Sequence, residues 1–393
     1  MSDTRNIVVL GASFGGLSAA HYTVRHILPK LKGSSEKYIL HLVDQSTHFW
    51  WHHGAPRAIV SVKDMKHSQY FAPIMDGFSQ YSEFKDSIVF HQGTITNVDN
   101  SARIVTMQKA EGGEETLSYY ALVIGTGIKS PTPLTTYHGD HTVSQKALDA
   151  MNEKLATAKE VVVGGGGPLG VEIAGELGSY LSGKAKVTLI TSNDKLFDVL
   201  RKSLADKAQK QLEKAGVKVV YGVRVLGSEE GPDGKANVKL DNGETMSVDV
   251  YIPAVGVTPN TGFLPESLKT SKGYVKANAK TMRVDEAGPH VYAVGDVAGV
   301  NKGGVMNLFD TIPVFGANMS HDLLAEAKAG TVAERQYKMG NQETQLVPVG
   351  KKTGVGAFNG WSMPAFFVSQ FKGKDYMVGQ MPPITQGTKW SKA

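Results

Sequence analysis

The chain has 393 residues, enough for about two or three domains with a substantial core, and its net charge of +5 is too small to indicate a nucleic-acid partner by itself. It contains no cysteine, which excludes disulfides, thiolate metal sites, iron–sulfur clusters and a redox-active cysteine pair. Any redox chemistry of this chain therefore has to belong to a bound cofactor. No apolar run approaches the ~20 residues of a membrane span, and the first strand begins too early for a signal peptide, so we expect a cytoplasmic protein.

A strand, a turn of small residues and a helix are predicted at the start of the chain. Residues 7–10 form an apolar run typical of a buried parallel strand, and residues 16–31 follow as a helix. Gly11, Ser13 and Gly16 stand in the turn at the G-x-G-x-x-G spacing that lets backbone approach a pyrophosphate at a helix N-terminus. Serine at the middle position is small enough for this approach and adds a hydroxyl donor.

A second strand is predicted over residues 38–43, and it ends at Asp44. An acid at the end of this strand normally accepts hydrogen bonds from the adenosine ribose hydroxyls of a dinucleotide. The spacing from Gly16 is longer than usual, and the polar loop before the strand accounts for the excess. The alternative is a strand-end aspartate that caps a turn.

Residues 47–60, THFWWHHGAPRAIV, combine aromatic residues with three histidines. No carboxylate is spaced to complete a metal site with His48, His52 and His53, so we expect no metal here. We expect the aromatic residues to pack against a flat cofactor, with Arg57 available to a phosphate or to the cofactor edge.

The next strands lead to a second small-residue turn. A strand, a turn and a strand are predicted over residues 88–99, and residues 102–108 pair with residues 115–127. The latter segment ends in Gly125-Thr126-Gly127, where small residues let backbone pass close to a ligand. Residues 128–141 carry prolines, glycine, serine and lysine, which indicates a linker and a domain boundary.

The strongest motif is VVVGGGGPLGVE at residues 161–172. Gly165, Gly167 and Gly170 have the G-x-G-x-x-G spacing: one makes the turn tight, one admits the pyrophosphate and one packs helix on strand. A glycine-rich structural loop is the alternative, but the strand–turn–helix context favours a dinucleotide site. Two such units suggest two dinucleotides, the arrangement of a flavoprotein that takes hydride from a nicotinamide.

The second unit, from about residue 144 to residue 262, is predicted to be self-contained. Its helices alternate with strands, and the PDG and DNG turns predict a hairpin across residues 229–244. Its second strand ends at Thr191, where an NAD-specific fold often has an acid. NADPH is therefore possible, but no arginine is placed to demand it, and both donors stay open.

The rest of the chain returns to the first unit and then becomes basic. Residues 290–299, HVYAVGDVAG, are predicted as a strand that ends in Gly295 and Asp296, and a helix is predicted over residues 312–330 with Pro313 near its start. Residues 331–393 hold eight lysines and arginines against three acids. Their excess of five positive charges equals the net charge of the whole chain.

Together these motifs resemble a known family. The paired glycine turns, GTG at 125–127, AVGVTPNT at 254–261 and VGD at 294–296 are similar to the two-dinucleotide-binding flavoproteins of the glutathione-reductase superfamily. Within it, FWWHHGAPRAIV and the ending VGKKTGVGAFNGWSMPAFFVSQFKGKDYMV look like the ferroptosis suppressor protein / apoptosis-inducing-factor-like branch, with type II NADH dehydrogenases more distant.

The resemblance covers essentially the whole chain and implies an α/β fold. Two Rossmann-like dinucleotide-binding domains are expected, the second inserted in the first, together with a small C-terminal α+β interface domain. The implied limits are residues 1–130 with 263–335 for the FAD-binding domain, 131–262 for the NAD(P)H-binding domain and 336–393 for the interface domain.

The resemblance also implies which residues contact the cofactors. Asp44 would bind the adenosine ribose and Asp296 the ribityl chain, while Arg57 and the backbone near Ile95 are weaker candidates. The FAD contacts are expected at Gly11, Ser13, Phe14, Gly15, Gly16, Asp44, Arg57, Ile95, Thr126, Gly127, Gly295 and Asp296. The NAD(P)H pyrophosphate is expected at Gly165, Gly167 and Gly170, and a further cofactor contact at Gly256. Glu172 would help position the nicotinamide side and is the candidate catalytic side chain.

The implied function is hydride transfer from NADH or NADPH to FAD, with electrons passed on to a quinone-type acceptor. The basic, aromatic C-terminal region is able to rest on an anionic membrane or to line the path of a quinone; the alternative is an ordinary interface domain with a solvated basic face. Two other functions stay open. One is a reductase of a protein electron carrier or a specialised metabolite. The other is a signalling flavoprotein, for which +5 is a weak basis for binding DNA.

Overall fold

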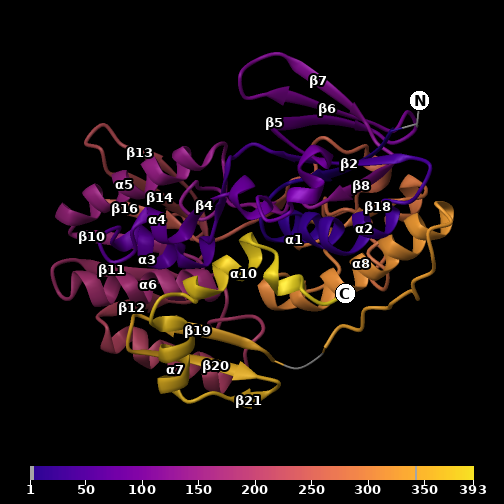
Figure 1. The fold of residues 1–393 in the computed structure, drawn as a ribbon. Helices are drawn as coiled ribbons and strands as arrows, with labels where there is room; N and C mark the ends of the chain where they lie inside the picture. The colour runs from indigo at the N-terminus through magenta and orange to yellow at the C-terminus, as the bar shows by residue number, and fades with distance from the viewer. Residues whose placement is uncertain (1–3, 341–342) are drawn as a thin grey trace.

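The computed structural model describes residues 4–340 and 343–393, and it contains a mixed sheet and a parallel sheet with a smaller C-terminal unit packed against them (Figure 1). This confirms the α/β class and the two Rossmann-like units predicted from the sequence. The first sheet has seven strands in the order β18 (Val291–Ala293), β8 (Ala121–Ile124), β1 (Thr4–Leu10), β2 (Lys37–Asp44), β5 (Ile88–Asp99), β6 (Ile104–Lys109) and β7 (Glu114–Ser118).

Strand β1 lies at the centre of the parallel part of this sheet. Ile7 stands opposite Ala121 of β8 on one side and opposite Leu40 of β2 on the other. Ile7 and Val9 pack into one core cluster and Val8 and Leu10 into another, which explains why residues 7–10 of the strand are all apolar. Strand β5 begins parallel to β2 and continues as one edge of the antiparallel ribbon β5–β6–β7.

The helices of the first unit differ in detail from the predicted ones. The helix expected over residues 16–31 begins earlier, as α1 (Phe14–Tyr22), and continues through a π-helical turn into α2 (Leu28–Leu31). The helix expected over residues 312–330 is α8 (Val305–Glu326), so placing Pro313 near its start was wrong. Gly304, with a φ of +86°, precedes the first residue of α8, and Pro313 lies in the helix interior.

The second sheet is parallel throughout, in the order β12 (Val217–Val220), β11 (Lys186–Ile190), β10 (Glu160–Gly164) and β16 (Val250–Pro253). Its helices are α5 (His141–Thr157), α6 (Pro168–Leu181) and α7 (Lys202–Lys214). The predicted hairpin is part of an antiparallel sheet of β13 (Val225–Glu230), β14 (Ala236–Leu240) and β15 (Thr245–Val248).

Two short strands join the two units. The chain leaves the first sheet through β9 (Ile128–Lys129) and returns through β17 (Thr258–Pro259), and these strands pair antiparallel. The second sheet is therefore built from the residues between β9 and β17. We propose the predicted domain limits, with residues 131–262 inserted between 1–130 and 263–335, on this arrangement.

The aromatic segment 47–60 folds between the two units. It contains β3 (His48–Trp50) and α3 (Ala55–Val60), followed by α4 (His67–Tyr70) and β4 (Phe71–Pro73), which pairs with β3. Helix α3 packs against α5 and α6 of the second unit. The segment therefore links the first sheet to the helices of the second.

Most of the C-terminal unit lies beneath α6 in Figure 1, whereas its last helix packs against α1. It contains the antiparallel strands β19 (Gln345–Val349), β20 (Thr353–Phe358) and β21 (Trp361–Ser362), and the helices α9 (Ala365–Val368) and α10 (Met381–Thr385). A Cβ added at Gly175 of α6 would lie 2.8 Å from Val349 Cα, so α6 and the end of β19 are in close contact. Within residues 4–340 and 343–393, none of the helices combines the length and apolarity that crossing a membrane requires.

Candidate functional site

The two predicted glycine turns have the same backbone geometry. Gly11 has a φ of +91° and Gly165 a φ of +125°. Gly11 N donates to Val43 O in β2 and Gly165 N donates to Ile190 O in β11, both at 2.8 Å. A Cβ added at Gly16 would lie 1.8 Å from Gly11 O, and one added at Gly170 would lie 1.8 Å from Gly165 O. Each helix is thus pressed onto its turn, as the spacing predicts.

The helix N-termini behind these turns are open. A Cβ added at Gly167, the N-cap of α6, would meet no atom within 4 Å, and Ser13, the N-cap of α1, makes no side-chain cap hydrogen bond. Free backbone N–H groups and the helix dipole favour an anion at such a position. Both turns therefore have space and donors for a pyrophosphate.

Two adjoining cavities of ≈ 280 and ≈ 340 Å³ follow the first turn. The first is lined by many of the predicted contacts: Gly11, Ser13, Phe14, Gly15, Asp44, Thr126, Gly127, Gly295 and Asp296. The second shares Gly11, Asp44 and Thr126 and adds Ile95. These residues come from five separate parts of the chain, and the first sheet brings them to the edge where its parallel strands end.

Other predicted contacts lie outside these cavities. Gly16 is used in packing α1 on its turn, and Gly256 is exposed, although its neighbour Val257 lines the first cavity. The glycines of the second turn line neither cavity, but Leu169 in the first turn of α6 reaches the first one. The second unit therefore contributes to one end of the same cavity.

Asp44 joins the first turn to the end of β2. Its carboxylate accepts hydrogen bonds from Ala12 N at 2.5 Å and from Ser46 N at 2.8 Å. Burial raises the pKa of Asp44 to about 6, although these two N–H donors act against the shift. Asp296 is held in a similar way, because its Oδ1 accepts a hydrogen bond from Gly304 N at 2.9 Å.

Two histidines, His52 and His53, lie at the apolar end of the first cavity. The rings of His52 and His53 stack at 5.3 Å, and Phe14 packs edge-on against both. Burial lowers the pKa of His52 to about 4 and that of His53 well below 6.5, so both imidazoles are neutral near pH 7. Leu169 and Leu308 complete an apolar lining.

Glu172 is buried in α6, and its carboxylate accepts a hydrogen bond from Lys372 Nζ at 2.6 Å. Burial raises the pKa of Glu172, and the charge of Lys372 opposes this shift. The same lysine lowers the pKa of His53 further, so the ion pair lies close to the histidine end of the cavity. No spacing in the sequence indicates this pair, because its members are 200 residues apart.

Arg57 does not reach the cavities, and the expectation that it is available to a phosphate or to the cofactor edge was wrong. Its guanidinium donates from Nε and Nη2 to Glu176 at 3.1 and 2.8 Å, and from Nη1 and Nη2 to the carbonyls of Lys374 and Gly373 at 2.6 Å each. Tyr376 OH donates to the same Glu176 carboxylate at 3.2 Å. Arg57 therefore holds the C-terminal unit against α3 and α6.

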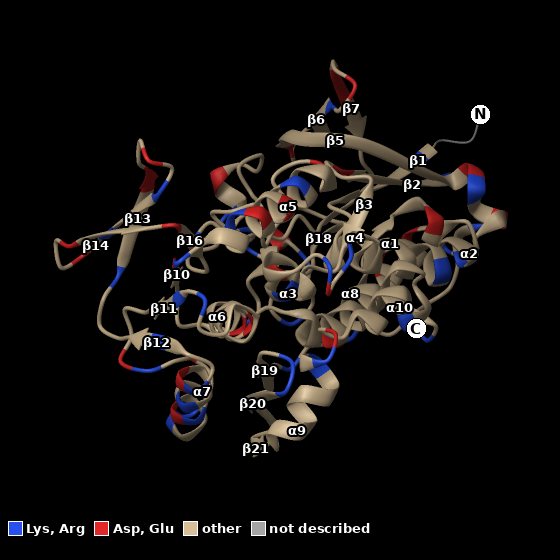
Figure 2. Ribbon diagram, turned by 90° about the vertical axis from the view of Figure 1, so that its left-hand side faces the viewer, with Lys and Arg blue, Asp and Glu red and all other residues tan. Residues whose placement is uncertain are grey.

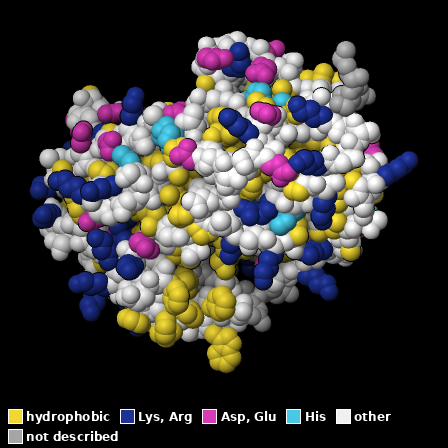
Figure 3. All heavy atoms as spheres, in the orientation of Figure 1, with side chains coloured by type: hydrophobic (Ala, Val, Ile, Leu, Met, Phe, Trp, Pro, Cys, Tyr) yellow, Lys and Arg dark blue, Asp and Glu magenta, His cyan; other side chains and the backbone are white. Residues whose placement is uncertain are grey.

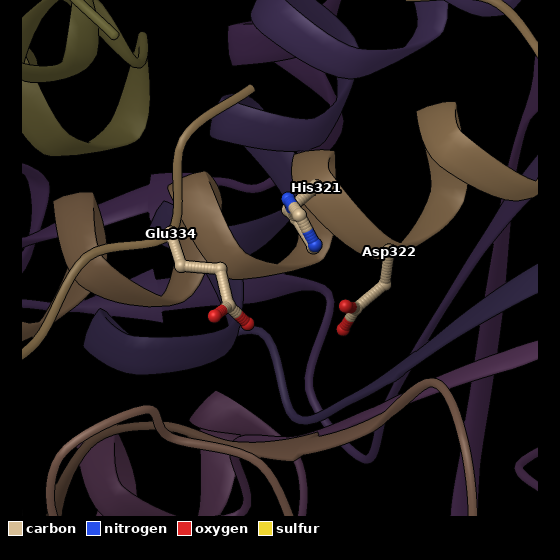
Figure 4. Close-up of side chains that lie close together, drawn as sticks. All are labelled: His321, Asp322 and Glu334. Carbon is tan, nitrogen blue, oxygen red and sulfur yellow. The ribbon is translucent and has the colours of Figure 1, made fainter. Parts of the chain in front are cut away.

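A group of possible metal ligands lies elsewhere, between α8 and the segment after it (Figure 4). The candidate ligand atoms of His321, Asp322 and Glu334 lie within 4.8 Å of one another. Arg283 already donates to Asp322 at 2.7 Å and pairs with Glu334 at 2.6 Å, and His321 Nδ1 hydrogen-bonds Val332 O at 2.7 Å. One arginine is thus shared by both carboxylates, and we interpret the group as an ion-pair network.

Comparison with known proteins agrees with this geometry. The family profile described as pyridine nucleotide-disulphide oxidoreductase matches residues 5–321. The oxidoreductase phnG of Penicillium herquei is 38% identical over 409 aligned residues, covering 99% of this chain and 97% of that protein. Human ferroptosis suppressor protein 1 is 28% identical, covering 96% of this chain and 95% of that protein.

Solved structures share the fold. NDH2 from Plasmodium falciparum in complex with NADH superposes with a TM-score of 0.64 at 15% identity, covering 98% of each chain. Together with the sequence relatives, this confirms the resemblance inferred from the motifs. The chain belongs to the pyridine nucleotide-disulphide oxidoreductase family.

Proposed function

We propose that this chain is an FAD-dependent oxidoreductase that takes hydride from NADH or NADPH and passes electrons to a quinone-type acceptor. The observation that carries the proposal is the repeated turn. A Cβ added at Gly16 would lie as close to Gly11 O as one added at Gly170 would lie to Gly165 O. One such turn at each parallel sheet supports two dinucleotides in one chain. The family match and the NADH complex of the P. falciparum neighbour support a nicotinamide donor.

The residues of the first cavity fit FAD. The start of α1 offers backbone donors and the Ser13 hydroxyl to a pyrophosphate, and Gly11 and Ser13 both line the cavity. The Asp44 carboxylate at the end of β2 suits the adenosine ribose hydroxyls. The Asp296 carboxylate suits the ribityl hydroxyls. The open N-terminus of α6 at Gly167 fits the pyrophosphate of NAD(P)H in the same way.

When bound, FAD accepts hydride from the reduced nicotinamide and delivers electrons to the acceptor. The chain itself would orient the nicotinamide and the flavin and exclude water. The apolar end of the cavity at Phe14, Leu169 and Leu308 suits that role. His52 and His53 are neutral, so they offer hydrogen bonds to a ligand there without adding positive charge.

We propose Glu172 as a positioning residue for the nicotinamide side. Its carboxylate fixes the ammonium of Lys372 beside the histidine end of the cavity, where a buried charge without a partner would be costly. The carboxylate and the ammonium together form a neutral pair. Neither residue lines the two cavities, so the pair would act from behind His53, without adding a net charge there.

The acceptor has to reach the flavin directly. The chain has no cysteine, so it lacks the disulfide that the family's name mentions. A flat and largely apolar acceptor suits the lining of the cavity end, and the relationship to ferroptosis suppressor protein 1 supports a quinone. A protein electron carrier or a specialised metabolite remains the competing acceptor.

An acceptor screen on the purified flavoprotein tests the proposal. NADH and NADPH oxidation is measured with a water-soluble quinone, a haem protein and an α,β-unsaturated ketone, each against Gly170→Ala as the control for the nicotinamide site. We expect turnover with the quinone, and in the control variant a KM for the nicotinamide donor that is about tenfold or more higher. Turnover with the haem protein or the ketone alone would move the assignment to the corresponding reductase. Retained FAD with no turnover on any acceptor would favour a signalling role.

A further inference from the structure

Five aromatic side chains of the C-terminal unit are exposed together, and we call them the aromatic surface. Trp361 exposes 80% of its area, Phe366 66%, Phe371 57%, Phe358 50% and Phe367 45%. The ring of Phe367 lies 5.8 Å from that of Phe366 and 6.2 Å from that of Phe371. Figure 3 shows apolar side chains gathered at the lower edge of the molecule, where Figure 1 has β20 and β21. Large apolar groups concentrated in this way mark an interaction surface.

The chain around the aromatic surface is basic. Residues 344–374 contain four lysines and no acid. Lys352 and Lys374 are exposed, Lys351 pairs with Asp64 at 3.1 Å and Lys372 turns inward to Glu172. Helix α7 packs against β20 beside the aromatic surface and carries both signs of charge, four lysines and two acids (Figure 2). Exposed aromatic groups therefore lie next to uncompensated positive charge.

We propose that the aromatic surface docks this protein on a membrane that contains anionic lipids. Tryptophan and phenylalanine side chains insert at the boundary between headgroups and acyl chains, and lysines near that plane attract anionic headgroups. A second copy of the chain is the other simple occupant. A two-fold contact, however, would bring Lys352 and Lys374 of one copy against the same patch of the other, which like charge disfavours.

The aromatic surface is the outer side of a segment whose inner side contacts Glu172 of α6. Phe371 faces outward, and the next residue, Lys372, donates to Glu172 in the interior. Docking would thus hold the segment behind Glu172 and His53 at the lipid surface. On the proposed function, which this step assumes, a lipid-dissolved acceptor would leave the membrane next to the cavity end that it has to reach.

Vesicle sedimentation of the purified holoprotein tests the docking. Vesicles of phosphatidylcholine alone are compared with vesicles of phosphatidylcholine and phosphatidylserine, at low and at raised salt. The variants are Trp361→Ser/Phe366→Ser/Phe371→Ser for the aromatic groups and Lys352→Glu/Lys374→Glu for the charge. Leu226→Ser is the matched control, because Leu226 is 65% exposed on β13, away from the aromatic surface. The flavin absorbance per chain reports folding of each variant.

We expect wild type and the Leu226 variant to bind the phosphatidylserine vesicles, and both test variants to lose about tenfold or more of the partition coefficient. Raised salt should weaken binding of the wild type. No binding of wild type to either vesicle would overturn the proposal. So would a wild-type dimer that the triple variant converts to a monomer, because a second copy would then be the occupant. Absence of both NADH and NADPH oxidation by the wild type in solution would refute the proposed function and leave the vesicle result standing.

Discussion

Gly16 and Gly170 hold corresponding places in the two turns, and this allows the two cofactor sites to be tested separately. A methyl group at either position would overlap a carbonyl oxygen of the turn at 1.8 Å, so the turn has to open. We expect Gly16→Ala to lose bound FAD, and Gly170→Ala to keep FAD but to raise the KM for NADH about tenfold or more, as overpacking of about 1–3 kcal/mol implies.

Flavin absorbance per chain and initial rates measure the two effects. Gly33→Ala is the matched control, because a Cβ at Gly33 meets no atom within 4 Å and should change neither quantity. Loss of FAD in Gly170→Ala with normal FAD in Gly16→Ala would reverse the assignment of the two turns.

Because Asp44 titrates, we expect the affinity for FAD to depend on pH. Its pKa is raised to about 6 in the free site, and ribose hydroxyls donate best to the ionised carboxylate. Affinity of the apoprotein for FAD should therefore fall as the pH drops below about 6, by up to about tenfold per pH unit, and level off above it. Asp44→Asn should bind about tenfold or more weakly at pH 7.5 and without this dependence. Fluorescence titration of FAD between pH 5 and 8 measures both, and equal pH profiles for the two proteins would exclude Asp44 as the titrating group.

Among single residues, the sequence predicted those whose role depends on neighbours along the chain. The glycine turns and Asp44 follow from local spacing, because a turn's geometry is set by about six consecutive residues. The partners of Arg57 and Glu172 lie 119 and 200 residues away, and no local pattern encodes such a contact. Arg57 was assigned to the cofactor because a conspicuous cation beside aromatic residues gives no sign of which carboxylate it will meet.

Among the elements, α3 and α6 are joined to the C-terminal unit through Arg57. The pair with Glu176 is almost fully buried, so removing one partner leaves a charge without compensation. We expect Arg57→Met to lower the free energy of unfolding by about 3–5 kcal/mol, while FAD content at low temperature stays normal. Urea denaturation of Arg57→Met, Glu176→Met and the double variant measures the coupling. A double variant as unstable as the sum of the single ones would show that the two side chains act independently.

Helix α10 is held against α1 by His21, whose ring nitrogens hydrogen-bond Tyr81 OH at 3.0 Å and Thr385 O at 2.8 Å. Burial lowers the pKa of His21 to about 4 from the ordinary 6.5. Between these values the unfolded chain binds a proton that the folded chain does not, so stability falls as the pH decreases from about 6.5 to about 4. His21 should contribute about 1.4 kcal/mol per pH unit to this slope. Urea midpoints at pH 7, 6 and 5 should show a shallower slope for His21→Asn, and an unchanged slope would contradict the prediction.

Element boundaries were predicted less well than element types. The alternation of apolar strand, turn and helix identified both sheets, and the PDG and DNG turns identified the hairpin. The start of α8 was missed because Pro313 is favoured at a helix N-terminus, whereas the packing of α8 along α1 keeps the helix continuous through the proline. Tertiary contacts decided this boundary.

At the scale of the whole molecule, the function depends on two units that share one cavity. Phe14 and His52 come from the first unit, and Leu169 and Val257 from the chain between β9 and β17. The sequence predicted both units but not the composition of their shared end, since that depends on how the C-terminal unit fixes one against the other. The neutral histidine pair at that end became apparent only from the structure.

An anaerobic stopped-flow experiment tests the central claim most directly. Purified flavoprotein is mixed with NADH and, separately, with NADPH, and the flavin absorbance band is followed before any acceptor is added. We expect rapid bleaching with at least one donor, the same bleaching in Gly170→Ala only at a donor concentration about tenfold or more higher, and recovery of the band when a quinone is added. A band that stays unchanged for seconds with both donors would contradict hydride transfer in this chain and leave the flavin with a structural role.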